Sequence, residues 1–308
     1  MSPGTRVVLF LLLVMMVFAT SAWSALILVA ARIAKRPAKK SWLARISFTL
    51  LAFGACCFEY GLFIEADWLE VTRITVETPK WPRGKVLRVA HLSDLHVDSR
   101  TRALSRIADV LRDEKIDLIV FSGDSLNSAD AAPLFRSVLG GLPARLGRVA
   151  VRGNHDVYRW GKVDLFGGGV ATELISDAPL LFEEGSLAIC GAPFGALDGV
   201  EGCLKSAPPE AFLLFLYHSP DLVEALQPQP DLYLTGHTHG GQVAMPVYGA
   251  LITMSNFDKR YEAGRYQVGK TTLCVNRGIG FEPRMPKVRF FARPEVTIIE
   301  LVGTGAPR

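Results

Sequence analysis

The sequence predicts an α/β domain that follows an N-terminal helical membrane anchor. Between residues 86 and 151, strand-like and helix-like patterns alternate, which is typical of a parallel sheet with helices packed on its face. The first 66 residues instead hold two long apolar runs, and these runs explain a mean hydropathy of +0.25. With 308 residues, the chain has room for one substantial domain and an appendage.

The two apolar runs predict membrane-spanning helices at about residues 7–31 and 46–64. The first run carries no charge and is long enough to cross a bilayer core of about 30 Å. The second run is interrupted only by Glu59, near its end. An alternative for the second run is a helix that docks the domain onto the membrane surface. A cleaved signal peptide is disfavoured, because the first run continues well past the small residues 20–22.

The connection between the runs, residues 32–45, is rich in Lys and Arg, and such short loops stay cytoplasmic. If both runs span the membrane, everything after Ala66 faces away from the cytoplasm. If only the first run spans, the domain lies on the cytoplasmic side. We expect the outward arrangement, although Arg73 and Lys80 add positive charge to the flank that follows the second run. The anchor would then be 1–66 and the domain 67–308.

Charge argues against a nucleic-acid partner. Of 34 basic and 30 acidic residues, seven and two lie in 1–66, which leaves 27 basic and 28 acidic residues, a net charge of −1, in 67–308. The net charge of +4 therefore reflects the anchor, and the domain lacks the positive field of a nucleic-acid binder.

The five cysteines show no zinc-ligand spacing. Cys56 and Cys57 lie in the second apolar run, and Cys274 lies late in the domain. Only Cys190 and Cys203 could pair in an oxidising compartment, and we expect them to be buried thiols.

The domain core begins at Trp81–Gly84, and the alternating residues 69–77 before it predict an edge strand. Helices are predicted at 102–114 and 130–139. Strands are predicted at 86–92, 118–122, 148–151, 180–183, 187–191, 212–217, 231–234, 271–275 and 296–301. We expect the glycine triplet 167–169 to belong to a loop or a helix start.

Five of the six histidines, together with carboxylates and an amide, follow the ends of these strands. In an open α/β sheet, strand ends deliver functional groups into a common crevice. Imidazole and carboxylate ligands suit borderline divalent metals, and one carboxylate can bridge two ions. The motifs therefore predict a two-metal hydrolytic site. Its candidate residues are Asp94, His96, Asp124, Asn154, His155, Asp156, His218, His237 and His239.

The amino-acid sequences and the order of the motifs resemble the calcineurin-like metallophosphoesterase family over residues 86–301. Ser93-Asp94-Leu95-His96, Gly236–Gln242, Asn276–Gly280 and Pro294-Glu295-Val296 resemble its membrane-associated bacterial branch. The resemblance implies a four-layer α/β/β/α sandwich of two mixed sheets at a bacterial cell membrane. It also implies two divalent ions (Mn²⁺, Fe or Zn²⁺), one bound by Asp94, His96 and His239, the other by Asn154, His218 and His237, with Asp124 bridging.

By the same resemblance, His155 is the catalytic histidine and Asp156 is its orienting partner. Because His155 directly follows the predicted ligand Asn154, it cannot easily bind the same ion. Its imidazole is therefore free to protonate a leaving oxygen. One departure is Asn127, near which many relatives carry an acidic residue after the Gly-Asp motif. Arg152 and Arg277 are candidates for phosphate contacts. His91 is expected to be a packed, hydrogen-bonded residue.

We therefore expect a membrane-anchored dinuclear metal phosphoesterase that acts on lipid-linked or envelope phosphates. One alternative is a UDP-2,3-diacylglucosamine pyrophosphatase of lipid A synthesis, which requires the cytoplasmic face. A second alternative is a non-catalytic binding module on the same fold, which should have lost ligands or the catalytic histidine. A nuclease is disfavoured by the near-neutral domain.

Overall fold

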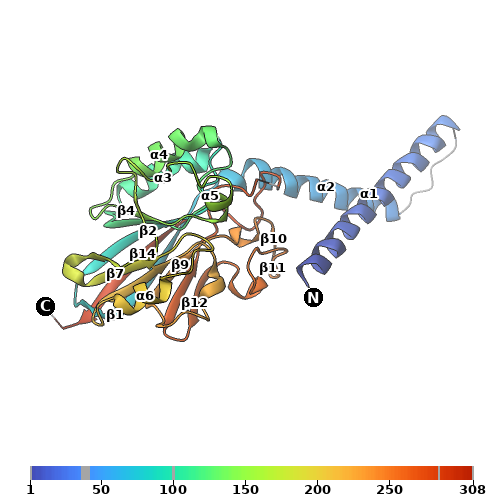
Figure 1. The fold of residues 1–308 in the computed structure, drawn as a ribbon. Helices are drawn as coiled ribbons and strands as arrows, with labels where there is room; N and C mark the ends of the chain where they lie inside the picture. Colours follow the sequence, from blue (N-terminus) through green and yellow to red (C-terminus); the bar gives the residue numbers. More distant parts are fainter. Residues whose placement is uncertain (1, 36–41, 99–100, 284, 307–308) are drawn as a thin grey trace.

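Two long helices project from an α/β domain (Figure 1). The computed structural model describes residues 2–35, 42–98, 101–283 and 285–306. Helices α1 (Pro3–Ile33) and α2 (Trp42–Phe63) contact one another through Ser47 Oγ, which donates to Thr20 Oγ1 at 3.0 Å. By length and composition both helices are candidate membrane spans, a few residues longer than predicted. Part of the predicted basic connection, residues 36–41, lies outside the described residues.

The first sheet has the strand order β1-β14-β2-β3-β4-β5. Strands β2 to β5 run parallel, which confirms the predicted βαβαβ progression, and β14 joins them antiparallel to β2. The predicted edge strand is β1, which pairs only with β14. The bounds are β1 (Glu70–Pro82), β2 (Val86–Leu92), β3 (Leu118–Phe121), β4 (Arg148–Ala150), β5 (Thr172–Glu173) and β14 (Glu295–Gly305).

The second sheet has the order β12-β13-β9-β8-β7-β6, with a parallel centre and antiparallel edge strands. A separate ribbon pairs β10 with β11. The bounds are β6 (Leu180–Phe182), β7 (Leu187–Gly191), β8 (Phe212–Leu216), β9 (Leu232–Thr235), β10 (Ala244–Met245), β11 (Gly249–Ala250), β12 (Gly264–Val268) and β13 (Thr271–Val275).

Three apolar cores separate four layers, so the predicted α/β/β/α sandwich is confirmed. Helices α3 (Arg102–Arg112) and α4 (Ala132–Gly141) bury Ile107 and Phe135 against the first sheet. The two sheets share a middle core that contains Val120 and Leu214. Helix α6 (Val200–Ser206) covers the outer face of the second sheet. The remaining helical segments are α5 (Asn154–Tyr158), η1 (Glu65–Asp67), η2 (Ala129–Ala131), η3 (Glu183–Gly185), η4 (Pro220–Leu222), η5 (His239–Gly241) and η6 (Asp258–Tyr261).

Cys190 and Cys203 form a disulfide, so the prediction of free thiols at these positions was wrong. Cys190 lies on β7 and Cys203 on α6, and the packing of the helix against the strand brings their Cα atoms to 6.0 Å. This separation is within the range that a disulfide requires. Both residues are buried, as predicted.

The end of α2 is fixed to the domain by buried polar contacts. Gly61 O accepts a hydrogen bond from Arg289 N at 3.1 Å, and the Glu65 carboxylate accepts one from Ala292 N at 2.8 Å. The Arg289 side chain is fully buried and donates to three carbonyl oxygens, among them Ala292 O. Because a guanidinium has five donors in a rigid fork, it can hold several loops at one point. The helix therefore leaves the domain from a defined position.

Candidate metal centre

The carboxyl ends of parallel strands from both sheets meet at one edge of the sandwich. From the first sheet, β2 leads to Asp94 and His96, β3 leads to Asp124, and β4 leads to the start of α5. From the second sheet, β8 leads to His218 and β9 leads to the turn that carries the last two histidines. Parallel strands place their ends side by side, so motifs far apart in the sequence converge here.

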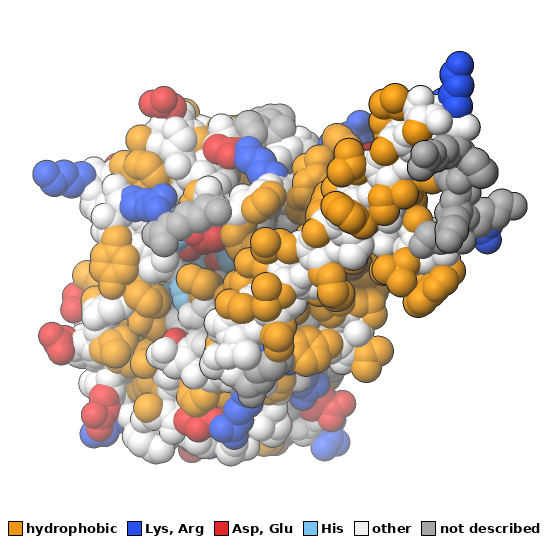
Figure 2. Space-filling model, turned by 90° about the vertical axis from the view of Figure 1, so that its right-hand side faces the viewer, with side chains coloured by type: hydrophobic (Ala, Val, Ile, Leu, Met, Phe, Trp, Pro, Cys, Tyr) orange, Lys and Arg blue, Asp and Glu red, His pale blue; other side chains and the backbone are white. Residues whose placement is uncertain are grey.

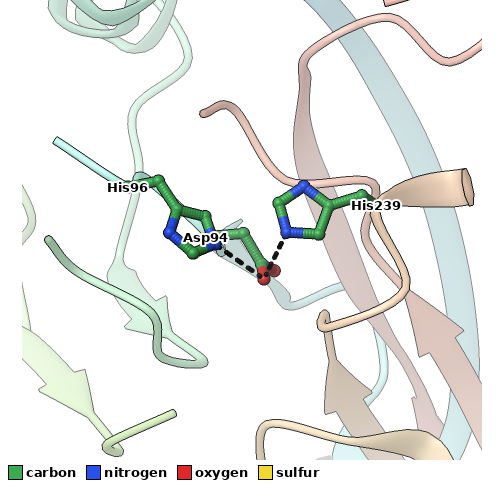
Figure 3. Close-up of side chains that lie close together, drawn as sticks. All are labelled: Asp94, His96 and His239. Atoms are coloured by element: carbon green, nitrogen blue, oxygen red, sulfur yellow. Dashed lines mark ion pairs between the residues drawn. The ribbon is translucent and has the colours of Figure 1, made fainter. Parts of the chain in front are cut away.

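Asp94 is completely buried at the centre of one group of histidines (Figure 3). Its Oδ1 lies 3.2 Å from His239 Nε2 and 4.0 Å from His96 Nε2. Its Oδ2 accepts a hydrogen bond from the backbone N–H of His237 at 3.0 Å. One oxygen of Asp94 therefore faces the imidazoles, while the other is fixed by the backbone.

Asp124 lies between two groups of side chains. Its Oδ2 is 3.5 Å from His96 Nε2 and 3.3 Å from His218 Nε2, and its Oδ1 accepts a hydrogen bond from His155 N at 2.8 Å. His237 Nδ1 lies 3.1 Å from His218 Nε2, so these two nitrogens face the same space. A carboxylate in this position can contact ions on both sides, as the sequence predicts for Asp124.

Two of the histidines have their Nδ1 atoms engaged outside the centre. His218 Nδ1 is 2.8 Å from Ser122 O, and His96 Nδ1 is 2.8 Å from Asn127 Oδ1. Since carbonyl oxygens accept only, each Nδ1 carries a proton, and each Nε2 is the ring nitrogen that faces inward and can bind a metal. Both rings are therefore presented in the tautomer that binds a metal.

The chemistry of the donor set fits divalent cations. Among the described residues, Asp94 Oδ1, His96 Nε2 and Asn154 Oδ1 are buried without a hydrogen-bond partner. An unsatisfied buried polar atom costs about 1–3 kcal/mol, so three in one place indicate a ligand-binding position. Ligand atoms lie within 4.8 Å of one another in three overlapping groups: Asp94, His96 and His239; His96, Asp124 and His155; and Asp94, Asp124 and His218. Two of these groups consist of three predicted ligands each, and the third combines two predicted ligands with His155.

Backbone strain is concentrated at the same place. Five predicted ligands have left-handed φ angles between +41° and +71°: Asp94, His96, Asp124, His237 and His239. Such a conformation costs a non-glycine residue about 1–3 kcal/mol and persists only where the surrounding structure enforces it. Two glycines make room for Asp94. A Cβ on Gly236 would lie 2.1 Å from Asp94 Oδ2, and one on Gly278 would lie 2.5 Å from Asp94 Cβ.

Electrostatics hold both carboxylates ionised and keep His96 and His237 neutral near neutral pH. Burial alone would raise the pKa of Asp94, but His239, His218 and His96 hold it well below its usual value. His218 and His96 likewise depress the pKa of Asp124 against the effect of burial. Burial lowers the pKa of His96 and of His237 to about 4, whereas Asp124 and Asp94 overcome burial and raise that of His218 to about 9.

Comparison with known proteins agrees with this geometry. The family model described as "Calcineurin-like phosphoesterase" matches residues 87–241, half of the chain. An uncharacterized metallophosphoesterase, YkuE of Bacillus subtilis, is 32% identical over 275 residues, which cover 83% of this chain and 95% of YkuE. The chain belongs to the calcineurin-like phosphoesterase family. It is therefore a metal-dependent phosphoric ester hydrolase by family.

Two further relatives of this calcineurin-like phosphoesterase have named activities. "Phosphodiesterase YaeI" of Escherichia coli is 34% identical over 263 residues, which cover 80% of this chain and 93% of YaeI. "UDP-2,3-diacylglucosamine pyrophosphatase LpxG" of Chlamydia muridarum is 25% identical over 299 residues, which cover 77% of this chain and 90% of LpxG. Both relatives match this chain over nearly their whole length.

In the structure, the Asp156 carboxylate contacts backbone N–H groups, whereas the sequence predicts that it orients the His155 ring. Asp156 is fully buried, and its two oxygens accept hydrogen bonds from Ser125 N at 2.8 Å and Gly153 N at 3.0 Å. Both oxygens therefore fix the loops that carry the ligands, and burial and Asp124 raise the pKa of Asp156 to about 6. His155 Nε2 instead lies 3.4 Å from Glu282 Oε2. Burial would lower the pKa of His155, but Glu282 and Asp124 raise it above its ordinary value.

The two arginines that were candidates for phosphate contacts form ion pairs with glutamates instead. Arg152 Nε donates to Glu173 Oε1 at 2.7 Å, and Arg277 Nε donates to Glu295 Oε2 at 2.9 Å. Their guanidinium groups are thereby engaged in holding the surrounding loops. His91 is fully buried, and its Nε2 lies 2.9 Å from Ser122 Oγ, as predicted for a packed residue.

The sequence analysis missed two polar contacts at the edge of the centre. These are the contact of Glu282 with His155 and the hydrogen bond between Asn127 and His96. Glu282 lies in a loop 127 residues after His155 in the chain, and no local pattern marks it. Asn127 could have been found from its spacing to the Gly-Asp motif, because a residue three positions after Asp124 lies close to the same strand end.

Proposed function

We propose that this protein is a membrane-anchored dinuclear metal phosphoesterase that hydrolyses a phosphoester bond of a lipid-linked or envelope substrate. Residues 1–66 would be the anchor and 67–308 the catalytic domain. The observation that carries the proposal is the position of Asp124, whose Oδ2 faces His96 on one side and His218 on the other. A single carboxylate flanked by two sets of ligand atoms is what two bridged cations require.

The contacts among these side chains support a ligand assignment. Asp94, with His96 and His239, would hold one divalent ion, and His218 with His237 and Asn154 would hold the other. Imidazole and carboxylate donors are compatible with Mn²⁺, Fe or Zn²⁺. When bound, such a pair of ions lowers the pKa of a coordinated water and stabilises charge on the phosphoryl oxygens.

The chain itself contributes positioning and a proton. The backbone N–H of His155 holds Asp124 Oδ1, so the bridging carboxylate and His155 are fixed relative to each other. The His155 ring stands edge-on to His96, with centroids 5.0 Å apart, and therefore borders the centre. With Glu282 beside its Nε2, the imidazole can hold a proton and donate it to the leaving oxygen.

Two features favour the outward orientation and hence an envelope substrate. The connection between the two apolar helices is basic, and such loops stay in the cytoplasm. The disulfide between Cys190 and Cys203 suits an oxidising compartment. A second candidate is cleavage of UDP-2,3-diacylglucosamine on the cytoplasmic face, favoured by the similarity to LpxG.

Hydrolysis assays test the proposal. Full-length protein, stripped by a chelator and reloaded with Mn²⁺, Zn²⁺ or Fe²⁺, would be given an aryl phosphodiester and UDP-2,3-diacylglucosamine in parallel. We expect metal-dependent cleavage of the aryl diester that Asp124→Asn abolishes and Glu300→Gln leaves intact. Glu300 is a suitable control because its carboxylate pairs with Arg88 on the first sheet and it is not among the predicted ligands. Cleavage of the nucleotide lipid would favour the second candidate, and no cleavage of either substrate would favour a non-catalytic module.

A further inference from the structure

Outside the two long helices, a group of exposed apolar side chains lies around the β10–β11 ribbon. We name this group the apolar rim, and it consists of Met245, Val247, Tyr248, Met254 and Phe291. Val247 stands at the tip of the turn between β10 and β11 and is fully exposed. A group of exposed apolar side chains gathered on one face is typical of a surface that contacts another phase or a partner.

The apolar rim is continuous with both candidate membrane helices. At one end, Ala244 N donates to Phe290 O at 2.8 Å, and the Phe290 ring packs edge-on against Tyr60 of α2 at 6.2 Å. At the other end, Arg6 of α1 donates to Leu251 O at 3.1 Å and pairs with Asp258. The ribbon therefore lies between the start of α1 and the end of α2.

The apolar rim also adjoins the metal centre. The carbonyl oxygen of Met254 accepts a hydrogen bond from His237 Nε2 at 3.0 Å, so a rim residue directly contacts a predicted ligand. In Figure 2, which shows the face from which the helices project, pale-blue histidine atoms are visible in a hollow beside the apolar surface. The centre thus opens on the same face as the helices.

Aromatic and cationic groups at this face suit a lipid headgroup region better than a protein partner. Lys259 Nζ lies 4.4 Å above the Tyr248 ring, and the Arg293 guanidinium lies 3.7 Å above the ring of the exposed Trp68. Tyr and Trp concentrate at membrane interfaces, where their rings sit at headgroup depth. Lys and Arg place apolar stems on lipid and their charges in the headgroup layer.

We propose that the apolar rim inserts into the bilayer surface and seats the metal centre against the lipid headgroups. The occupant of this surface is the lipid bilayer itself. A substrate whose phosphate lies at headgroup depth would then reach the centre without leaving the membrane. This inference rests on the membrane anchoring in the proposed function, and it adds a second contact that the anchor alone does not require.

Fluorescence of a labelled cysteine at the tip tests the proposal in the full-length protein. The background is Cys56→Ser with Cys57→Ser, since Cys274 is buried and the other two cysteines are bonded. Val247→Cys would carry the polarity-sensitive dye NBD, and the protein would be reconstituted in phosphatidylglycerol–phosphatidylcholine vesicles. The matched control is Val86→Cys, an exposed position at the start of β2, the strand whose other end leads to the centre.

We expect the dye at Val247 to shift to shorter wavelength and to be quenched at least twofold by lipids with a shallow nitroxide, and the dye at Val86 to do neither. Equal water exposure at the two positions would overturn the proposal. A blue shift without nitroxide quenching would also overturn it, because a protein contact would then cover the tip.

Separate measurements distinguish failure of the proposed function from failure of this inference. Extraction of the protein from vesicles by alkaline carbonate would contradict the anchoring. Absence of hydrolysis with every metal would contradict the phosphoesterase activity, and it would not alter the fluorescence result.

Discussion

Loss of the disulfide between Cys190 and Cys203 should destabilise the domain by an amount that follows from the loop it closes. The two cysteines are 13 residues apart in sequence. For a loop of that size, the chain-entropy relation gives a stabilisation of about 3 kcal/mol at 25 °C. The double variant Cys190→Ala with Cys203→Ala avoids leaving a lone buried thiol, and Cys274→Ala controls for the loss of one buried sulfur.

Urea unfolding measures the effect. With a slope of about 3 kcal/mol per M, a loss of about 3 kcal/mol moves the midpoint down by about 1 M. The parent protein in dithiothreitol should unfold at the midpoint of the double variant, while Cys274→Ala should respond to dithiothreitol as the parent does. If the double variant and the untreated parent unfolded at the same midpoint, the bond would not constrain the chain as the relation requires.

The same cysteines report the compartment of the domain. Membranes would be quenched in acid, and free thiols would be alkylated under denaturing conditions and located by mass spectrometry. We expect Cys274 to be alkylated and Cys190 and Cys203 to be protected until reduction. Alkylation of all three without reduction would refute the reasoning that places the domain in an oxidising compartment.

The remaining predictions concern the metal centre. Asp124→Asn should lose both metal, measured by mass spectrometry of bound elements, and activity, whereas His155→Ala should retain metal and lose most activity; a fully active His155→Ala would contradict its catalytic role. Glu282→Gln removes a charge 3.4 Å from His155 Nε2. If this contact contributes about 1.4 kcal/mol to the transition state, kcat should fall about tenfold with little change in KM. A change in KM alone would contradict a positioning role for Glu282. Asn127→Asp places a charged acceptor on His96 Nδ1, so metal affinity should rise about tenfold in competition with a chelator, and an unchanged affinity would contradict the orienting contact.

The residues of the predicted centre follow strong, local signals in the sequence. Each motif directly follows a predicted strand. In this type of sheet the carboxyl ends of parallel strands lie at the same edge. Asp94 and Asp124 were therefore placed together although 30 residues separate them. The strands β2, β3 and β8 lie within a residue of their predicted bounds for the same reason, since each is a short, mainly apolar run.

Elements whose existence depends on tertiary contacts were missed. Strand β5 has two residues, and it exists only through its pairing with β4. Strand β12 alternates half-buried and exposed residues of mixed polarity, so its pairing with β13 is not evident from composition. The contact of Glu282 with His155 is also purely tertiary. The hydrogen bonds of Asp156 and the Cys190–Cys203 bond were not predicted, because sequence shows neither the direction of a carboxylate nor the distance between two Cα atoms.

The two ends of the anchor constrain how it can cross a membrane. Arg6, near the start of α1, pairs with Asp258 of the domain, and Gly61, near the end of α2, accepts from Arg289. If α1 crosses a bilayer while its start stays at the domain, its other end lies on the far side, and α2 must bring the chain back. A single crossing by α1 is therefore incompatible with both contacts, which leaves two crossings or none. Two crossings place the basic connection opposite the domain, and the preference of such loops for the cytoplasm then favours an outward domain, where the Cys190–Cys203 bond is stable.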